Sequence, residues 1–82
     1  MKIKFSNDEF NYLKKNLFIE RKDLVSAFQI AENTLVELDE GTVDEIRDWA
    51  GEKQQIVGFD KDYSLTPEGK LLDEIIDTLF QD

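Results

Sequence analysis

Cysteine and histidine are both absent from this chain of 82 residues, which contains one proline and one tryptophan. Without cysteine the chain has no disulfide, no thiolate ligand for zinc or iron–sulfur clusters and no thiol nucleophile. Without histidine it lacks the commonest general base near neutral pH and the commonest transition-metal ligand. Hydrolase sites that depend on a histidine are therefore excluded. We expect no catalytic activity, no cofactor and no bound metal.

Long hydrophobic runs are also missing, since none approaches the roughly 18 residues that a membrane-spanning helix needs. Residues 1–8 carry no apolar segment of the signal-peptide kind. We therefore expect a cytoplasmic protein without membrane association. Hydrophobic residues make up 40% of the chain, which is enough for one core, and the length suits a single domain over residues 1–82.

The charge is strongly negative and unevenly distributed. Acidic residues outnumber basic ones by 19 to 10, for a net charge of −9. Residues 1–22 carry six basic and three acidic side chains, whereas residues 23–82 carry four basic and sixteen acidic ones. This acidity repels phosphate backbones, so it disfavours direct nucleic-acid binding, and it suits a protein partner with a basic surface.

The N-terminal segment predicts a strand followed by a helix. Residues 2–5 alternate polar and apolar side chains, which predicts a short strand with Ile3 and Phe5 inward. We expect this strand to pair with residues 63–65. Ser6 and Glu9 have the spacing of a capping box, so a helix should begin there. Its apolar stripe consists of Phe10, Leu13 and Leu17.

The middle of the chain predicts a second helix over residues 24–38. Its apolar residues follow helical spacing and are Leu24, Ala27, Phe28, Ala31, Leu35 and Leu38. Gly41 is expected to end it. We favour a break near residues 19–23, but the spacing also allows one continuous helix over residues 7–39.

Two further helices have clear start signals. Thr42 and Glu45 form a second capping box, and Gly58 should end that helix in a Schellman turn with Phe59 folded back. Its expected buried residues are Val43, Ile46, Trp49, Ala50, Ile56 and Val57. Thr66 followed by Pro67 marks the last helix. Its apolar face consists of Leu71, Leu72, Ile75, Ile76, Leu79 and Phe80.

These elements predict a mainly α fold, a compact bundle of three to four helices with a short N-terminal strand that pairs with residues 63–65. The acidic loop that begins at Asp60 resembles the start of an EF-hand calcium loop. Leu65 and Leu71, however, stand where such a loop needs glycine and a bidentate glutamate, so we interpret it as an ordinary loop. Tyr63 in this loop is either a surface anchor or a lid over the last helix, and Trp49 is expected in the core.

Residues Tyr63-Ser64-Leu65-Thr66-Pro67-Glu68-Gly69-Lys70-Leu71-Leu72 resemble the wing-to-final-helix stretch of winged-helix regulators of the MarR and PadR type. The resemblance implies a wing hairpin over residues 54–62 and a DNA-reading helix over residues 43–57. Residues 54–59 continue a helical stripe instead, and the acids of that helix would repel DNA. A helix through Val57 would argue against the regulator hypothesis.

The whole chain is loosely similar to small acidic bacterial and phage proteins without an assigned function. This likeness implies a fold and a setting but no activity. Our leading hypothesis is a non-catalytic protein-interaction module, such as an immunity or inhibitor protein, and the alternative is a divergent winged-helix transcription-regulator relative. A third hypothesis is self-assembly between the basic first quarter and the acidic remainder. The predicted partner-binding residues are Asp39, Glu40, Asp44, Glu45 and Asp48.

Overall fold

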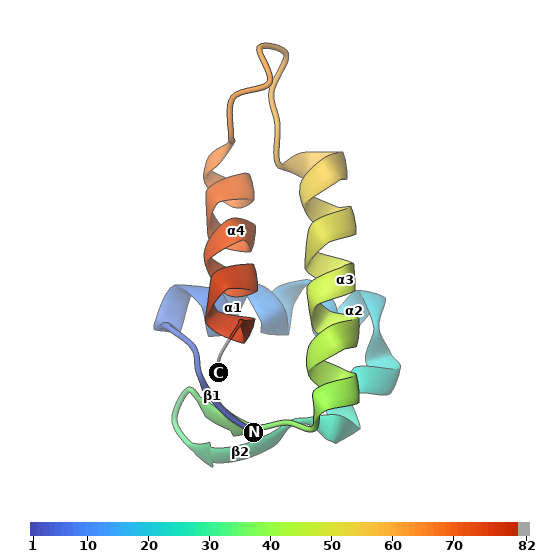
Figure 1. Ribbon diagram of the computed structural model, residues 1–82, viewed down its shortest axis with the longest axis vertical. Coiled ribbons are helices and arrows are strands. Elements are labelled where there is room, and N and C mark those ends of the chain that lie inside the picture. The colour runs from blue at the N-terminus through green and yellow to red at the C-terminus, as the bar shows by residue number, and fades with distance from the viewer. Residues whose placement is uncertain (81–82) are drawn as a thin grey trace.

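The computed structural model describes residues 1–80, in which helices dominate over one small antiparallel sheet. Two long helices stand side by side, with the sheet at their lower end and the shorter helices packed against the lower half of the pair (Figure 1). The predicted mainly α fold is confirmed. The elements in chain order are β1 (Lys2–Lys4), α1 (Asn7–Lys15), α2 (Leu17–Glu20), the 3-10 helix η1 (Lys22–Ala27), β2 (Gln29–Glu32), β3 (Leu35–Glu37), α3 (Glu40–Val57) and α4 (Pro67–Leu79).

The first helix begins at its predicted capping box. The Ser6 hydroxyl accepts a hydrogen bond from the Glu9 backbone N–H at 3.1 Å, and the Glu9 carboxylate accepts one from the Ser6 N–H at 2.7 Å. α1 ends at Asn16, and the single turn of α2 ends at Arg21. The break predicted near residues 19–23 is confirmed, and the alternative of one helix over residues 7–39 is wrong.

The N-terminal strand forms as predicted but has a different partner. Ile3 and Phe5 are both buried, in agreement with the alternating pattern. β1 pairs with β3, which places Ile3 opposite Val36, and β3 lies between β1 and β2. The predicted pairing with residues 63–65 is wrong, because that segment lies at the far end of the long helices (Figure 1).

The predicted helix over residues 24–38 is also wrong, since this segment forms η1 and the hairpin of β2 and β3. Asn33 makes the hairpin turn with a φ of 50°, in the left-handed region that asparagine tolerates. Val36 and Leu38 are both buried and lie two residues apart, as the alternation of a strand requires, whereas the helical pattern had grouped Leu38 with Leu35 and left Val36 out. The side chain of Ala31, assigned to that stripe, lies outside what the structure describes.

The start of α3 differs from the prediction by a few residues. The Asp39 carboxylate accepts a hydrogen bond from the Thr42 backbone N–H at 2.7 Å, so Asp39 is the N-cap rather than Thr42. Gly41 therefore lies in the first turn of α3 and ends no earlier helix. α4 begins as predicted, because the Thr66 hydroxyl accepts a hydrogen bond from the Gly69 N–H at 3.0 Å.

Gly58, which follows the last residue of α3, lies close to Gly69 in the first turn of α4. A Cβ atom on Gly69 would lie 2.2 Å from the Gly58 carbonyl oxygen, so a larger residue does not fit at position 69 without movement of the backbone. Gly58 ends α3 as predicted, but its φ is −84°. A Schellman turn needs the left-handed region, so the predicted turn is wrong and Phe59 stays partly exposed.

The core lies between the first part of α3, the inner side of α4, α1 and the sheet. Trp49 is buried as predicted, with its ring 6.2 Å from that of Tyr12, and its Nε1–H donates a hydrogen bond to Glu20 at 3.1 Å. Ile56 lies on the same face of α3 as Trp49, about two turns closer to the C-terminal end of the helix. It is 78% exposed, so its predicted burial is wrong.

Hydrogen bonds between side chains join α1 to α4. The Tyr12 hydroxyl donates to the Glu68 carboxylate at 2.5 Å, and the Thr78 hydroxyl donates to the Glu9 carboxylate at 2.8 Å. Burial raises the pKa of Tyr12, and the hydrogen bond to the carboxylate of Glu68 raises it further. These contacts reach the first and the last turn of α4 and so fix its position against α1.

The segment that a winged-helix regulator would use as its wing is mostly helical. Gln54 to Val57 form the last turn of α3, and the loop beyond contains a single bridge between Phe59 and Leu65. The wing hairpin that the resemblance implies over residues 54–62 is therefore not formed. The helix continues through Val57, as its apolar stripe indicates.

Candidate protein-interaction surface

The acidic residues predicted to bind a partner do not act as one cluster. Glu40, Asp44 and Asp48 follow one another at four-residue spacing and so lie on the same side of α3. Asp39 and Glu45 are engaged elsewhere, in a helix cap and in an ion pair. The predicted set therefore divides into three residues on one surface and two with structural contacts.

Asp39 uses its carboxylate to begin α3. The hydrogen bond from the Thr42 backbone N–H lowers the pKa of Asp39, because it favours the ionised form of the side chain. A carboxylate at this position also interacts favourably with the positive end of the helix dipole. The charge of Asp39 is therefore explained by helix stability.

Glu45 points away from the other acids and binds Arg21. The two side chains are 3.2 Å apart, and the same guanidinium is 3.0 Å from Asp23. The ion pair lowers the pKa of Asp23 and raises that of Arg21. This group links η1 to the first half of α3, which gives Glu45 a structural role in the absence of any partner.

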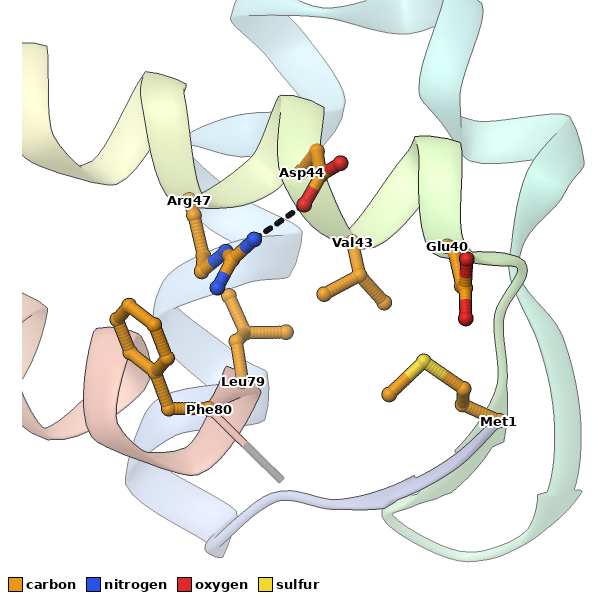
Figure 2. Close-up of a pocket in the computed structure, with 7 residues that line it drawn as sticks. All are labelled: Met1, Glu40, Val43, Asp44, Arg47, Leu79 and Phe80. Atoms are coloured by element: carbon orange, nitrogen blue, oxygen red, sulfur yellow. Dashed lines mark hydrogen bonds and ion pairs between the residues drawn. The ribbon is translucent and has the colours of Figure 1, made fainter. Parts of the chain in front are cut away.

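The remaining acids line a groove between α3 and α4, which we call the acidic groove. Two overlapping hollows share Asp44, Arg47 and Phe80, and the one drawn in Figure 2 has a volume of about 520 Å³. The acidic groove as a whole is lined by Met1, Glu40, Val43, Asp44, Arg47, Asp48, Ile76, Leu79 and Phe80.

Arg47 lies at the middle of the acidic groove and contacts both walls. Its guanidinium forms an ion pair with Asp44, one turn earlier on α3, and lies 4.4 Å from the centroid of the Phe80 ring (Figure 2). A cation in this position is attracted to the face of the ring. Arg47 thus holds Phe80 at the edge of the groove, where 66% of its surface is exposed.

Acidic side chains outnumber basic ones along the α3 side of the groove. Carboxylates at four-residue spacing on a helix repel each other, at a cost of about 0.2–0.5 kcal/mol per pair. Arg47 offsets the charge of Asp44, but within residues 1–80 Glu40 and Asp48 form no ion pair. The groove therefore combines uncompensated negative charge with an exposed aromatic ring, which suits a cationic group next to an apolar one.

Sequence reasoning missed two residues of this surface, Arg47 and Phe80. Phe80 was expected on the buried face of α4, whose Leu72, Ile75 and Leu79 are indeed buried. The position of Arg47 carried a signal, because it is the one basic residue among the acids of residues 39–48 and follows Asp44 by three positions. The contact of Arg47 with Phe80 joins two helices and has no local signature.

The structure also bears on the position of Tyr63, on metal binding and on membrane-spanning helices. Tyr63 is 86% exposed, so the prediction of a lid over the last helix is wrong and the side chain lies on the surface. Among residues 1–80, no group of three or more carboxylates is placed to hold a metal ion. Within the same residues, no helix combines the length and the apolar character needed to cross a bilayer.

Comparisons with known proteins identify no relative, so the function is inferred from the geometry of this surface. No protein-family model matches the chain, and no curated protein or solved structure shows significant similarity to it.

Proposed function

We propose that the protein is a small, non-catalytic interaction module that binds a basic segment of another protein in the acidic groove. The observation that supports this best is the position of Glu40, Asp44 and Asp48 beside the exposed ring of Phe80. A lysine or arginine of the partner would meet the carboxylates, and a neighbouring apolar side chain would pack against Phe80.

The unpaired charge adds physical support. Arg47 already offsets Asp44, the middle acid of the row, so a bound cation would act mainly on Glu40 and Asp48, which form no ion pair within residues 1–80. The net charge of −9 would speed the encounter with a basic partner through long-range attraction.

An immunity or inhibitor protein of a bacterium or phage is the concrete form that we propose, acting in the cytoplasm. Such a protein would mask a basic surface that its partner otherwise uses to bind nucleic acid. The negative charge supports this proposal, because it makes the module a competitor of the phosphate backbone.

The electrostatic part of the proposal is tested with Glu40→Gln/Asp48→Asn, which removes two charges that have no ion pair within residues 1–80. The matched control is Glu32→Gln/Asp73→Asn, which removes the same charge from exposed positions of β2 and α4 outside the groove. A partner captured from a native lysate on the wild-type protein would be purified and titrated by calorimetry at 0.05–0.5 M salt. We expect the first variant to bind roughly tenfold more weakly and with less salt dependence.

The apolar part is tested with Phe80→Ala against Ile19→Ala, since the two side chains are 66% and 65% exposed and only Phe80 lines the groove. We expect Phe80→Ala to weaken binding and Ile19→Ala to leave it unchanged. Equal affinities for the two variants, or binding that does not respond to salt, would contradict the proposal.

A further inference from the structure

The loop that connects α3 to α4 carries a second exposed surface, at the end of the molecule opposite the sheet (Figure 1). Four large apolar side chains occur within ten residues there, on the last turn of α3 and on the loop. We call them the apolar tip. They are Ile56, Phe59, Tyr63 and Leu65, with 78%, 45%, 86% and 36% of their surfaces exposed.

Hydrogen bonds within the loop order the backbone that carries Phe59, Tyr63 and Leu65. The Asp60 N–H donates to the Ser64 carbonyl and the Tyr63 N–H to the Asp60 carbonyl, both at 3.0 Å. The Asp60 carboxylate accepts from the N–H groups of Asp62 and Ser64 at 2.9 and 3.2 Å. At the base of the loop the Thr66 hydroxyl donates to the Val57 carbonyl. A loop ordered in advance loses little conformational entropy when it binds.

Tyr63 has a backbone conformation that its side chain disfavours. Its φ is 62°, in the left-handed region where glycine and asparagine are usual and a bulky residue is an outlier. Because the side chain is 86% exposed, burial in the core does not compensate for this strain. Glycine would serve the turn better, so the fold alone gives no reason for a tyrosine here. Strained residues of this kind concentrate at functional sites.

We propose that the apolar tip inserts into a concave apolar cleft of a partner protein whose rim is basic. The tip is a loop that projects beyond the helix pair, so a concave surface can cover it from several sides (Figure 1). Asp60 and Asp62 stand on either side of Lys61 between Phe59 and Tyr63, and the chain has a net charge of −9. Positive residues at the rim of the cleft would complement these charges. Tyrosine is one of the residues that dominate such interfaces.

Shape and charge both disfavour a second copy of this chain as the occupant. Two convex tips would bury far less than the roughly 800 Å² per partner of a stable interface, and two molecules of charge −9 repel each other. The same charge disfavours insertion into an anionic bilayer. The apolar tip is also separate from the acidic groove, because Glu40 and Asp44 lie in the first turns of α3 and Ile56 in its last turn.

The experiment begins with a photo-crosslinking phenylalanine analogue in place of Tyr63 in the full chain, with the same analogue at Lys70 as the control. Adducts formed in a native lysate are identified by mass spectrometry, and the partner that is crosslinked from position 63 only is purified. It is then titrated with wild-type protein, Tyr63→Gly and Ile56→Ser, and with Ile19→Ser as the control for an exposed isoleucine.

We expect Tyr63→Gly to weaken binding by about 30-fold, the loss typical of a tyrosine hot spot, while its Tm stays equal to or above that of the wild type. Ile56→Ser should weaken binding and Ile19→Ser should not. A groove variant, Glu40→Gln/Asp48→Asn, separates this proposal from the proposed function: it should change the affinity for a partner of the groove, whereas the contact at position 63 should persist in the crosslinking assay.

Several outcomes would overturn the proposal. One is the absence of an adduct specific to position 63, and another is an unchanged affinity of Tyr63→Gly for the crosslinked partner. An adduct with a second copy, together with a dimer in sedimentation that Tyr63→Gly abolishes, would assign the tip to self-association. Binding of the wild type but not Tyr63→Gly to phosphatidylcholine/phosphatidylglycerol vesicles would assign it to a membrane.

Discussion

The α3–α4 pair and the segment from Lys22 to Glu37 show how differently two regions of one chain encode their structure. Each long helix has a capping side chain that bonds to its own first turn, at Asp39 and at Thr66. The segment from Lys22 to Glu37 has apolar residues at helical spacing but forms a 3-10 helix and two strands. Local hydrogen bonds determine the first region, whereas pairing with a distant strand determines the second.

The difference lies in how many structures each pattern permits. In α4, proline at the first position and a broad apolar face favour a helix and disfavour a strand. Around β3 (Leu35–Glu37) the pattern is ambiguous, because Leu35 and Leu38 have the spacing of a helix while Val36 and Leu38 have that of a strand, and valine and asparagine are poor helix formers. When local preferences are this weak, the burial of Val36 against Ile3 decides the outcome.

The largest expected effect concerns the core that the two regions share. Ile46→Ala in α3 should lower the free energy of unfolding by about 2–5 kcal/mol, and Val36→Ala in β3 by about 2 kcal/mol, because both side chains are fully buried. Urea unfolding followed by far-UV circular dichroism and by Trp49 fluorescence should give coincident transitions in each variant. Two separate transitions would mean that the helix pair folds independently of the sheet.

Asn33 offers a test in which the sign of the effect distinguishes a hairpin from a helix. With its φ of 50°, Asn33→Ala should destabilise the protein by about 1 kcal/mol, and Asn33→Gly should have no such cost. In a helix the order would be reversed, because alanine is the best helix former and glycine a poor one. Urea unfolding of both variants measures the difference, and a more stable Asn33→Ala would contradict the hairpin.

Asp39 tests where α3 begins. Asp39→Ala should lower Tm by roughly 4–8 °C through loss of the cap, and Asp39→Asn should retain most of the wild-type Tm. Because the pKa of Asp39 is lowered by folding, its charge stabilises the protein above the unfolded pKa of about 3.9. That stabilisation is lost as the pH falls through the folded pKa. Asp39→Asn should therefore lose less stability between pH 5 and pH 2 than the wild type.

The smallest expected effect concerns the contact between α2 and α3. The hydrogen bond from Lys53, followed by that from Trp49, lowers the pKa of Glu20. Because Glu20 is exposed, solvent screening limits the ion pair to about 0.5 kcal/mol, which Glu20→Gln should remove. Urea unfolding at low salt and at about 0.5 M salt should show this difference shrinking as salt increases. A difference that salt does not change would assign the effect to hydrogen bonding instead.

The candidate surface was predictable in part. Charge counting pointed to residues 39–48, and helical spacing accounts for the three acids that share one side of α3. The sequence could not show that Asp39 caps the helix, because that depends on where α3 begins. Nor could it show that Glu45 is paired with Arg21, because these residues are 24 positions apart. The exposure of Phe80 could not be predicted either. The apolar stripe of α4 has the same sequence pattern whether or not another element covers its C-terminal end.

By itself the sequence determined the mainly α character, the start of α1 and α4, the burial of Ile3, Phe5 and Trp49, and the net charge of −9. These features depend on hydrogen bonds and periodicities within a few residues. Only the tertiary structure decided that Val36 belongs to a strand, that β1 pairs with β3, and that Ile56 and Tyr63 remain exposed. Those outcomes depend on which distant surfaces meet, because an apolar side chain is buried only where another element covers it.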